Sequence, residues 1–212
     1  MAKKCMIISG GAYTPIPAAV EDVYVIACDR GYQYALQAEV EPDLVVGDFD
    51  SYDGDLNPLI QTQRYKKEKD DTDTMIAVKE ALAAGCSEIE IFCALGGRLD
   101  HTFANIQSAA YAVERGAFVT IQDNDSVLYF FSAGSMRLPR QEGFSLSVFS
   151  ITDRCSDVSI RGTKYLLEHV ELTNAFPLGV SNEWVEDTAE VCVGSGILMI
   201  MLSKLRQDNG LC

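Results

Sequence analysis

Short apolar runs alternate with helical patterns over the first half of the chain. The runs predict strands at residues 5–9, 23–28, 44–47, 64–66, 88–94 and 118–122. Helices are predicted at 30–37, after Asp73 and after Asp100, where apolar residues recur at helical spacing and Gly85 and Gly116 mark the ends. Strands that alternate with helices in this way predict a parallel sheet, and such sheets bind ligands at the carboxyl ends of their strands.

The pattern changes from about residue 127. Short apolar runs then follow one another, separated by turn residues and without a helical period, at 127–131, 136–138, 144–149, 158–160, 170–172, 190–193 and 197–202. This pattern is typical of an antiparallel β-sandwich or barrel. A polar cluster at 123–126 marks the boundary. We therefore predict an α/β fold followed by an all-β fold: a Rossmann-like parallel-sheet domain at 1–123 and an antiparallel domain at 124–212.

Charge and composition limit the possible partners. The 212 residues include 17 Lys and Arg against 31 Asp and Glu, a formal net charge of -14. Nucleic acids and anionic membranes both require a basic surface, so we expect neither as a partner. The four apolar residues after Lys3 and Lys4 are too few for a signal peptide. Seven cysteines without CxxC spacing predict small core residues in a reducing, cytoplasmic setting.

Acidic residues gather directly after four of the predicted strands. They are Asp29, Asp48 with Asp50, Asp70 to Asp73, and Asp100. Carboxyl ends of parallel strands meet at one edge of a sheet, and Mg²⁺ prefers carboxylate and phosphate oxygens there. Neighbouring glycines would let backbone approach a nucleotide, and Lys69 and Arg98 could hold its phosphates. These features together favour magnesium–nucleotide chemistry. Taken singly, Asp73 and Asp100 could equally be helix N-caps, and Asp48 or Asp50 a turn residue.

Five motifs follow one another in a specific order and spacing. They are Asp29–Gly31, Gly47–Ser51, Lys69–Thr74, Gly96–His101 with Asn105, and Leu178–Glu183. From about Ile7 to Leu202 the chain resembles the bacterial-type thiamine pyrophosphokinases, also called thiamin diphosphokinases. The resemblance implies an ATP-binding α/β domain, a thiamine-binding β-sandwich, and transfer of the diphosphate of ATP to thiamine, giving thiamine diphosphate and AMP. It also implies a homodimer with its site at the interface.

The resemblance and the acidic cluster together suggest a role for each candidate. Mg²⁺ would be held by Asp48, Asp50, Asp71, Asp73 and Asp100. Asp71 or Asp100 would accept the thiamine hydroxyl proton, and Arg98 would stabilise phosphate charge. The ATP side would comprise Gly10, Gly11, Asp29, Gly31, Asp48, Lys69, Asp70, Thr72 and Thr74. Thiamine would be bound by Ser181, Asn182 and Trp184, with the indole against its cationic rings. Trp184 could instead be a core residue of the β domain.

Two other functions remain open at this point. Asp48-Phe49-Asp50 is similar to the paired acids of haloacid-dehalogenase-type phosphatases, although Tyr52 stands where those enzymes have Thr or Val. A magnesium-dependent phosphatase is therefore one alternative. A non-catalytic sensor of nucleotide or thiamine is the other, although sensing alone would not need so many carboxylates. Incubation with ATP, Mg²⁺ and thiamine distinguishes the three functions by their products.

Overall fold

The computed structural model describes residues 3–18, 22–48, 57–65 and 70–205. The chain divides into two compact units, Met1–Asn124 and Asp125–Cys212, called unit 1 and unit 2 below. Each is described by itself.

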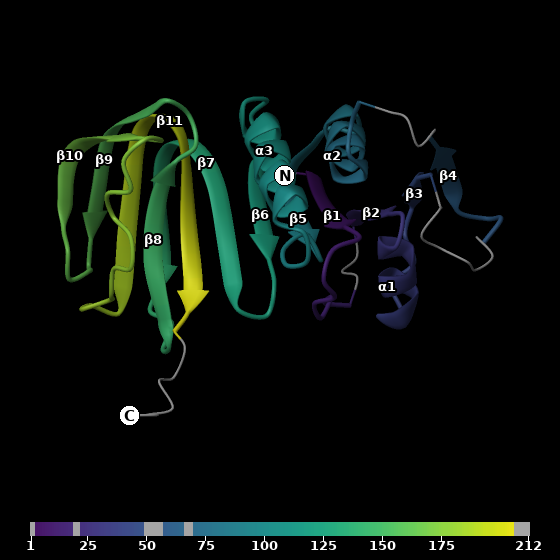
Figure 1. Ribbon diagram of the computed structural model, residues 1–212, viewed down its shortest axis with the longest axis horizontal. Helices are drawn as coiled ribbons and strands as arrows, with labels where there is room; N and C mark the ends of the chain where they lie inside the picture. Colours follow the sequence, from purple (N-terminus) through teal and green to yellow (C-terminus); the bar gives the residue numbers. More distant parts are fainter. Residues whose placement is uncertain (1–2, 19–21, 49–56, 66–69, 206–212) are drawn as a thin grey trace. The chain divides into compact units, whose positions relative to one another are not determined.

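Unit 1 is built on a parallel sheet with the strand order β6-β5-β1-β2-β3-β4 (Figure 1). The strands are β1 (Lys3–Ile8), β2 (Val23–Cys28), β3 (Leu44–Gly47), β4 (Gln61–Arg64), β5 (Cys86–Phe92) and β6 (Phe118–Gln122). Contiguous apolar runs form the central strands because helices cover both faces of such a sheet. β4 lies at the edge, and its four polar residues are mostly exposed. It begins three residues before the strand expected at 64–66.

Three helices pack on this sheet. They are α1 (Gly31–Gln37), α2 (Asp73–Ala83) and α3 (Leu99–Val113). α2 and α3 contact each other on one face, and α1 lies on the other (Figure 1). Thr72 caps α2, since its hydroxyl accepts the Met75 N–H at 3.2 Å. Asp73 is therefore the first helical residue and not the N-cap. α3 has Arg98 at its N-cap position, without a side-chain cap bond, so Asp100 does not cap it either.

Unit 2 contains antiparallel strands. They are β7 (Ser126–Pro139), β8 (Phe144–Ser150), β9 (Arg154–Arg161), β10 (Leu167–Thr173) and β11 (Thr188–Lys204). The order is β10-β9-β11-β7, and β8 also pairs with β11. β11 pairs with β9 through its first half and with β8 through its second half. β8 and β9 are thus both joined to this one strand.

Two pairs of expected strands are single strands in the structure. The runs at 127–131 and 136–138 both belong to β7, and those at 190–193 and 197–202 both belong to β11. The pairing of β7 with β11 shifts register between Val193 and Ile197, where the sequence suggested a turn. Gly196 has a φ of +86° there, and a Cβ on it would clash with the Arg154 carbonyl oxygen. Glycine here marks a bulge inside a strand and not the end of one.

The cysteines of the described residues are free thiols. Cys5, Cys28, Cys86, Cys93 and Cys155 are buried, and Cys192 is partly buried. Burial raises the pKa of the Cys5, Cys86 and Cys93 thiols, which keeps these thiols protonated. Among the helices that the structure describes, none is long and apolar enough to cross a membrane.

Candidate active site

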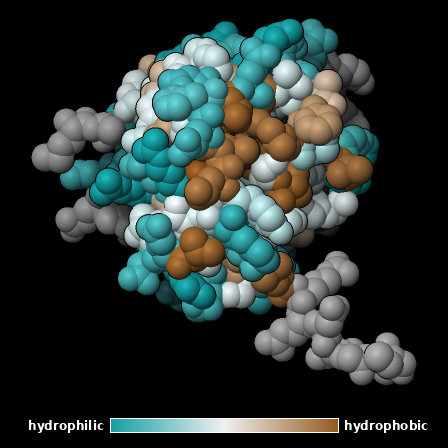
Figure 2. All heavy atoms as spheres, turned by 90° about the vertical axis from the view of Figure 1, so that its left-hand side faces the viewer, coloured by the Kyte–Doolittle hydropathy of each residue, from teal (hydrophilic) through white to brown (hydrophobic). Residues whose placement is uncertain are grey.

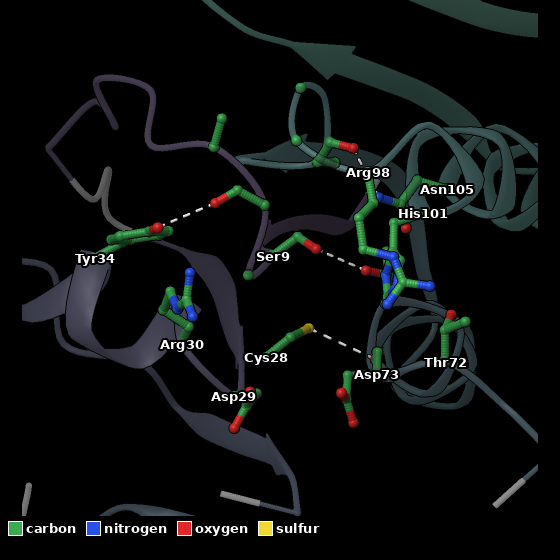
Figure 3. Close-up of a pocket in the computed structure, with 17 residues that line it drawn as sticks. Ser9, Cys28, Asp29, Arg30, Tyr34, Thr72, Asp73, Arg98, His101 and Asn105 are labelled. Atoms are coloured by element: carbon green, nitrogen blue, oxygen red, sulfur yellow. Dashed lines mark hydrogen bonds between the residues drawn. The ribbon is translucent and has the colours of Figure 1, made fainter. Parts of the chain in front are cut away.

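Unit 1 contains a pocket of about 630 Å³ at the carboxyl ends of β1, β2 and β5 (Figure 3). The first turns of α2 and α3 close its other side. The lining residues are Ser9, Gly10, Gly11, Ala12, Cys28, Asp29, Arg30, Tyr34, Thr72, Asp73, Thr74, Ala94, Gly96, Gly97, Arg98, His101 and Asn105. The pocket therefore lies where a parallel α/β sheet is expected to bind its ligand.

Close backbone packing forms one wall of the pocket. A Cβ added to Gly11 would lie 2.5 Å from the carbonyl oxygen of Cys93, and the Gly11 N–H already donates to that oxygen at 2.8 Å. A Cβ on Gly31 would clash with the carbonyl oxygen of Ile8. Both positions therefore require glycine, because the loops after β1 and β2 touch their neighbours through backbone atoms.

Buried hydrogen bonds fix the start of α2 against the sheet. The hydroxyls of Ser9 and Thr74, both buried, share a hydrogen bond of 2.7 Å. The Cys28 thiol donates to the Asp73 carbonyl oxygen at 3.6 Å (Figure 3). The backbone that carries the Asp73 carboxylate is thus held from β1 and from β2, which restricts its position in the pocket.

Two further hydrogen bonds hold the loops after β1 and β5. The buried Asn105 amide donates to the Ala94 carbonyl oxygen at 2.7 Å, which ties α3 to the loop after β5. The Tyr34 hydroxyl donates to the Gly11 carbonyl oxygen at 3.0 Å (Figure 3). Tyr13 packs edge-on against the Tyr34 ring with centroids 5.3 Å apart. The glycine-containing loop after β1 is consequently clamped onto α1.

The structure brings only part of the predicted site together. The predicted residues that line the pocket are Gly10, Gly11, Asp29, Thr72, Asp73, Thr74 and Arg98. Gly31 is buried at the start of α1. Asp48, Asp70, Asp71 and Asp100 are described but are not among the lining residues. Asp50 and Lys69 lie outside the described residues.

Asp71 and Asp100 are each hydrogen-bonded to a basic side chain. The Lys79 ammonium donates to the Asp71 carboxylate at 2.6 Å, and this bond raises the pKa of Lys79. The Arg98 guanidinium binds both oxygens of Asp100, with Nε–Oδ1 at 3.1 Å and Nη2–Oδ2 at 2.5 Å. The Arg98 hydrogen bond, with help from the His101 N–H, holds the pKa of Asp100 below its ordinary value. The Asp71 side chain is 40% exposed and the Asp100 side chain is 61% exposed. Ion pairs this close to water are weak, so either carboxylate can exchange its basic partner for another ligand at little cost in free energy.

Within the described ranges, no group of three or more His, Cys, Asp or Glu side chains is close enough to hold a metal ion. Mg²⁺ does not require such a cage, because it is usually held by one or two carboxylates together with substrate phosphates. Asp73 provides a hard oxygen donor in the pocket, and Asp29 lies on the opposite wall (Figure 3). This donor set fits a magnesium ion that arrives with a nucleotide.

The three candidates for binding thiamine differ in exposure. Ser181 is exposed, with a φ of +57°, and its backbone N–H donates to the Ser147 hydroxyl at 2.9 Å. Trp184 is only 7% exposed, and its indole N–H donates to the Leu138 carbonyl oxygen at 3.1 Å. That arrangement corresponds to the core-residue alternative for Trp184, and it leaves no open ring face for stacking in unit 2 taken by itself.

Asn182 is buried, and its amide is used entirely within unit 2. Its nitrogen donates to the Thr163 hydroxyl at 3.0 Å and to the Tyr165 carbonyl oxygen at 2.7 Å. Its oxygen accepts the backbone N–H groups of Tyr165 and Glu183, each at 3.0 Å. An amide has two donor hydrogens and two acceptor lone pairs, so no capacity remains for a ligand. These bonds fix the loop that carries Asn182, and its part in thiamine binding stays a prediction.

Sequence reasoning missed several lining residues. Ser9, Cys28 and Tyr34 carry no motif of their own, although each lies within three residues of a predicted site residue, and Arg30 lies inside the motif Asp29–Gly31 without an assigned role. Their position in the chain could have indicated them, because Ser9 directly follows β1 and Cys28 ends β2 at the ligand-binding edge of the sheet. Asn105 belonged to a motif but had no assigned role, and its bond to Ala94 shows that it fixes a loop.

Fold and pocket together define an α/β protein that binds a small ligand at the carboxyl ends of a parallel sheet. Comparison with known proteins gives the family. Residues 19–121 match the family model "Thiamin pyrophosphokinase, catalytic domain", and residues 135–198 match "Thiamin pyrophosphokinase, vitamin B1 binding domain". The chain belongs to the thiamin pyrophosphokinase family.

Individual relatives agree with this assignment over nearly the whole chain. A thiamine pyrophosphokinase of Bacillus subtilis (strain 168) is 28% identical over 211 residues, which cover 95% of this chain and 99% of the relative. A crystal structure of the B. subtilis protein has a TM-score of 0.84 at 26% identity and covers 97% of this chain and 100% of its own. The thiamin pyrophosphokinase structure from Geobacillus thermodenitrificans has a TM-score of 0.79 at 27% identity, with coverages of 94% and 97%.

Proposed function

We propose that the pocket of unit 1 binds ATP and that unit 2 contributes the contacts for thiamine. The chain is an ATP-dependent enzyme that forms thiamine diphosphate and AMP. The observation that carries the proposed division is the pocket itself, because its lining residues 28–105 fall within the catalytic-domain match. We assign residues 1–123 to a Rossmann-like ATP-binding domain and 124–212 to a thiamine-binding β-sandwich.

Asp73 is the first candidate for holding magnesium in this pocket. Asp73 lines the pocket, and Asp71 and Asp100, which are not among its lining residues, are the next proposed magnesium ligands. Asp48 and Asp50 complete the proposed acidic set. When bound, Mg²⁺ would neutralise negative charge on the phosphates and so ease attack on phosphorus.

The reaction would be an in-line displacement at the β-phosphorus of ATP. The thiamine hydroxyl oxygen forms a bond to that phosphorus, the bond to the bridging oxygen of the α-phosphate breaks, and AMP leaves with that oxygen. Asp71 or Asp100 would take the hydroxyl proton. Arg98 would move its hydrogen bonds from Asp100 to phosphate oxygens, since a guanidinium pairs equally well with either. Lys69, Asp70, Thr72 and Thr74 would surround the phosphates, with Gly10, Gly11, Asp29 and Gly31 on the nucleotide side.

For the thiamine side, we propose that Ser181 makes the direct contact. Its side chain is exposed, whereas Asn182 and Trp184 are buried and would act by shaping the loop that presents it. The segment lies within the match to the vitamin B1 binding domain.

We also propose a homodimer with a composite site, in the cytoplasm. Exposed apolar side chains gather on the face of unit 2 shown in Figure 2. Large apolar residues exposed in this unit include Tyr165, Leu166, Phe176, Leu178, Val180 and Val185. Exposed apolar side chains in this number are typical of a surface that another subunit covers. Sedimentation under assay conditions tests the proposal, and a monomer with full activity would contradict it.

A single incubation with ATP, Mg²⁺ and thiamine tests the proposed function. Chromatography should show AMP and thiamine diphosphate as the products. ADP with thiamine monophosphate would contradict diphosphate transfer. Free phosphate without thiamine diphosphate would favour the phosphatase alternative, and saturable binding without turnover would favour the sensor.

A further inference from the structure

Arg30 reaches the pocket from the turn between β2 and α1. It lines the pocket, and its side chain is exposed. Figure 3 shows the guanidinium between Tyr34 and Asp29, with Asp73 and Arg98 on the other side of the view. It therefore faces the space into which a ligand would enter.

The backbone of Arg30 is fixed on both sides. Asp29 has a φ of +46°, which turns the chain sharply at the end of β2. Gly31 packs so closely against the Ile8 carbonyl oxygen that no Cβ fits there. The Arg30 carbonyl oxygen accepts the Gln33 N–H at 3.0 Å, which anchors the residue to the first turn of α1. The side chain thus starts from a defined point, and a cation on a rigid base loses less entropy when it binds an anion.

The two arginines of the pocket differ in their partners. Arg98 is engaged by both oxygens of Asp100. Across the described part of the chain, the Arg30 guanidinium has no ion pair and no side-chain hydrogen bond. A guanidinium carries five N–H donors in a planar fork that matches two phosphate oxygens.

We propose that Arg30 binds a phosphate group of the nucleotide in this pocket. The inference rests on the proposed function, since it assigns a residue within the proposed ATP site. Because the contact is to phosphate, Arg30 contributes to the affinity of every phosphorylated nucleotide, including the product AMP. It contributes nothing to the binding of the nucleoside.

Calorimetric titration of the full-length protein with ATP, AMP and adenosine tests this role. Arg30→Gln should weaken ATP and AMP binding about tenfold, the value expected for loss of one charge-assisted contact, and leave adenosine binding unchanged. Arg30→Lys should keep part of the affinity because it retains the charge without the fork. Arg115→Gln is the matched control. It removes the same charge from unit 1. Arg115 follows the end of α3, stacks on the Tyr111 ring and lies outside the pocket. Its three affinities should equal those of the wild type.

Each other result contradicts the assignment. An equal loss for adenosine in Arg30→Gln would place the contact on the nucleoside. Unchanged ATP and AMP affinities would remove Arg30 from the binding site while leaving the proposed function intact. A wild-type protein that binds neither ATP nor AMP would overturn both the proposed ATP site and the role of Arg30. Thermal unfolding of each variant shows whether it is folded before its affinities are compared.

Discussion

Replacing Asn182 by alanine removes a buried amide that makes four hydrogen bonds. Its partners are the Thr163 hydroxyl, the carbonyl and N–H of Tyr165, and the N–H of Glu183. Each bond contributes about 0.5–1.5 kcal/mol, and an orphaned buried partner costs more. Thr163 is 2% exposed, so its hydroxyl would lose the bond from Asn182 in a dry interior and keep only its own bond to the Tyr165 carbonyl oxygen at 3.2 Å, whereas the exposed Tyr165 can regain water. We therefore expect Asn182→Ala to lower the free energy of unfolding of unit 2 by about 2–4 kcal/mol.

Urea unfolding followed by tryptophan fluorescence measures this loss. The chain has one tryptophan, Trp184, and it is buried in unit 2, so the signal reports that unit. With a slope of about 2 kcal/mol per molar urea, a loss of about 3 kcal/mol lowers the midpoint by about 1.5 M. Ser181→Ala is the control, because only the backbone N–H of Ser181 is hydrogen-bonded and its side chain is exposed. Its midpoint should correspond to a change within about 0.5 kcal/mol.

Thiamine binding separates the two roles. Ser181→Ala should weaken thiamine binding at unchanged stability, and Asn182→Ala should lose stability first. The reasoning is refuted if Asn182→Ala unfolds at the wild-type urea concentration and fails to bind thiamine. The amide would then contact the ligand directly, and its hydrogen bonds inside unit 2 would contribute nothing measurable.

Two further predictions concern the acids of unit 1. Asp73→Asn should reduce turnover of ATP and thiamine about a hundredfold or more, because shape is kept and charge is lost, while thermal unfolding stays unchanged; turnover near the wild-type rate would reduce Asp73 to a structural role. Arg98→Gln should raise the pKa of Asp100, since the Arg98 hydrogen bond is the main cause of its depression. Protonation of Asp100 would then begin at higher pH, and carboxyl ¹³C chemical shifts measured against pH should show it; an unchanged titration would show that the ion pair does not persist in solution.

The sequence predicted the central strands well for a physical reason. β2 and β3, which lie inside the sheet, have the bounds expected from their apolar runs, because strands buried on both faces are continuously apolar. β4 was misplaced, since Gln61–Arg64 is a polar edge strand whose residues carry no hydrophobic signal. In unit 2, glycines inside β7 and β11 were read as turns, although pairing across a bulge continues both strands. Such pairing depends on distant partners, which local patterns do not contain.

The candidate site was predictable by position but not by side-chain direction. Of the acids expected after the strands, Asp29 and Asp73 line the pocket. The sequence did not indicate that Asp71 would bond to Lys79, two turns along α2, or that Asp100 would bond to Arg98. Which basic side chain each carboxylate meets depends on where the neighbouring Lys and Arg side chains point once the helices are packed. The burial of Asn182 likewise follows from its contact with a loop that is distant in sequence.

Three adjacent residues at the start of α2 have different roles: two anchor the helix and the third lines the pocket. Thr72 supplies the cap by accepting the Met75 N–H, and Thr74 anchors the turn to Ser9. Asp73, between them, takes part in neither bond through its side chain, and its carboxylate lines the pocket. A change of this carboxylate to an amide therefore leaves both anchors in place. If thermal unfolding is also unchanged, loss of activity in Asp73→Asn can be assigned to the lost charge and not to a disturbed helix.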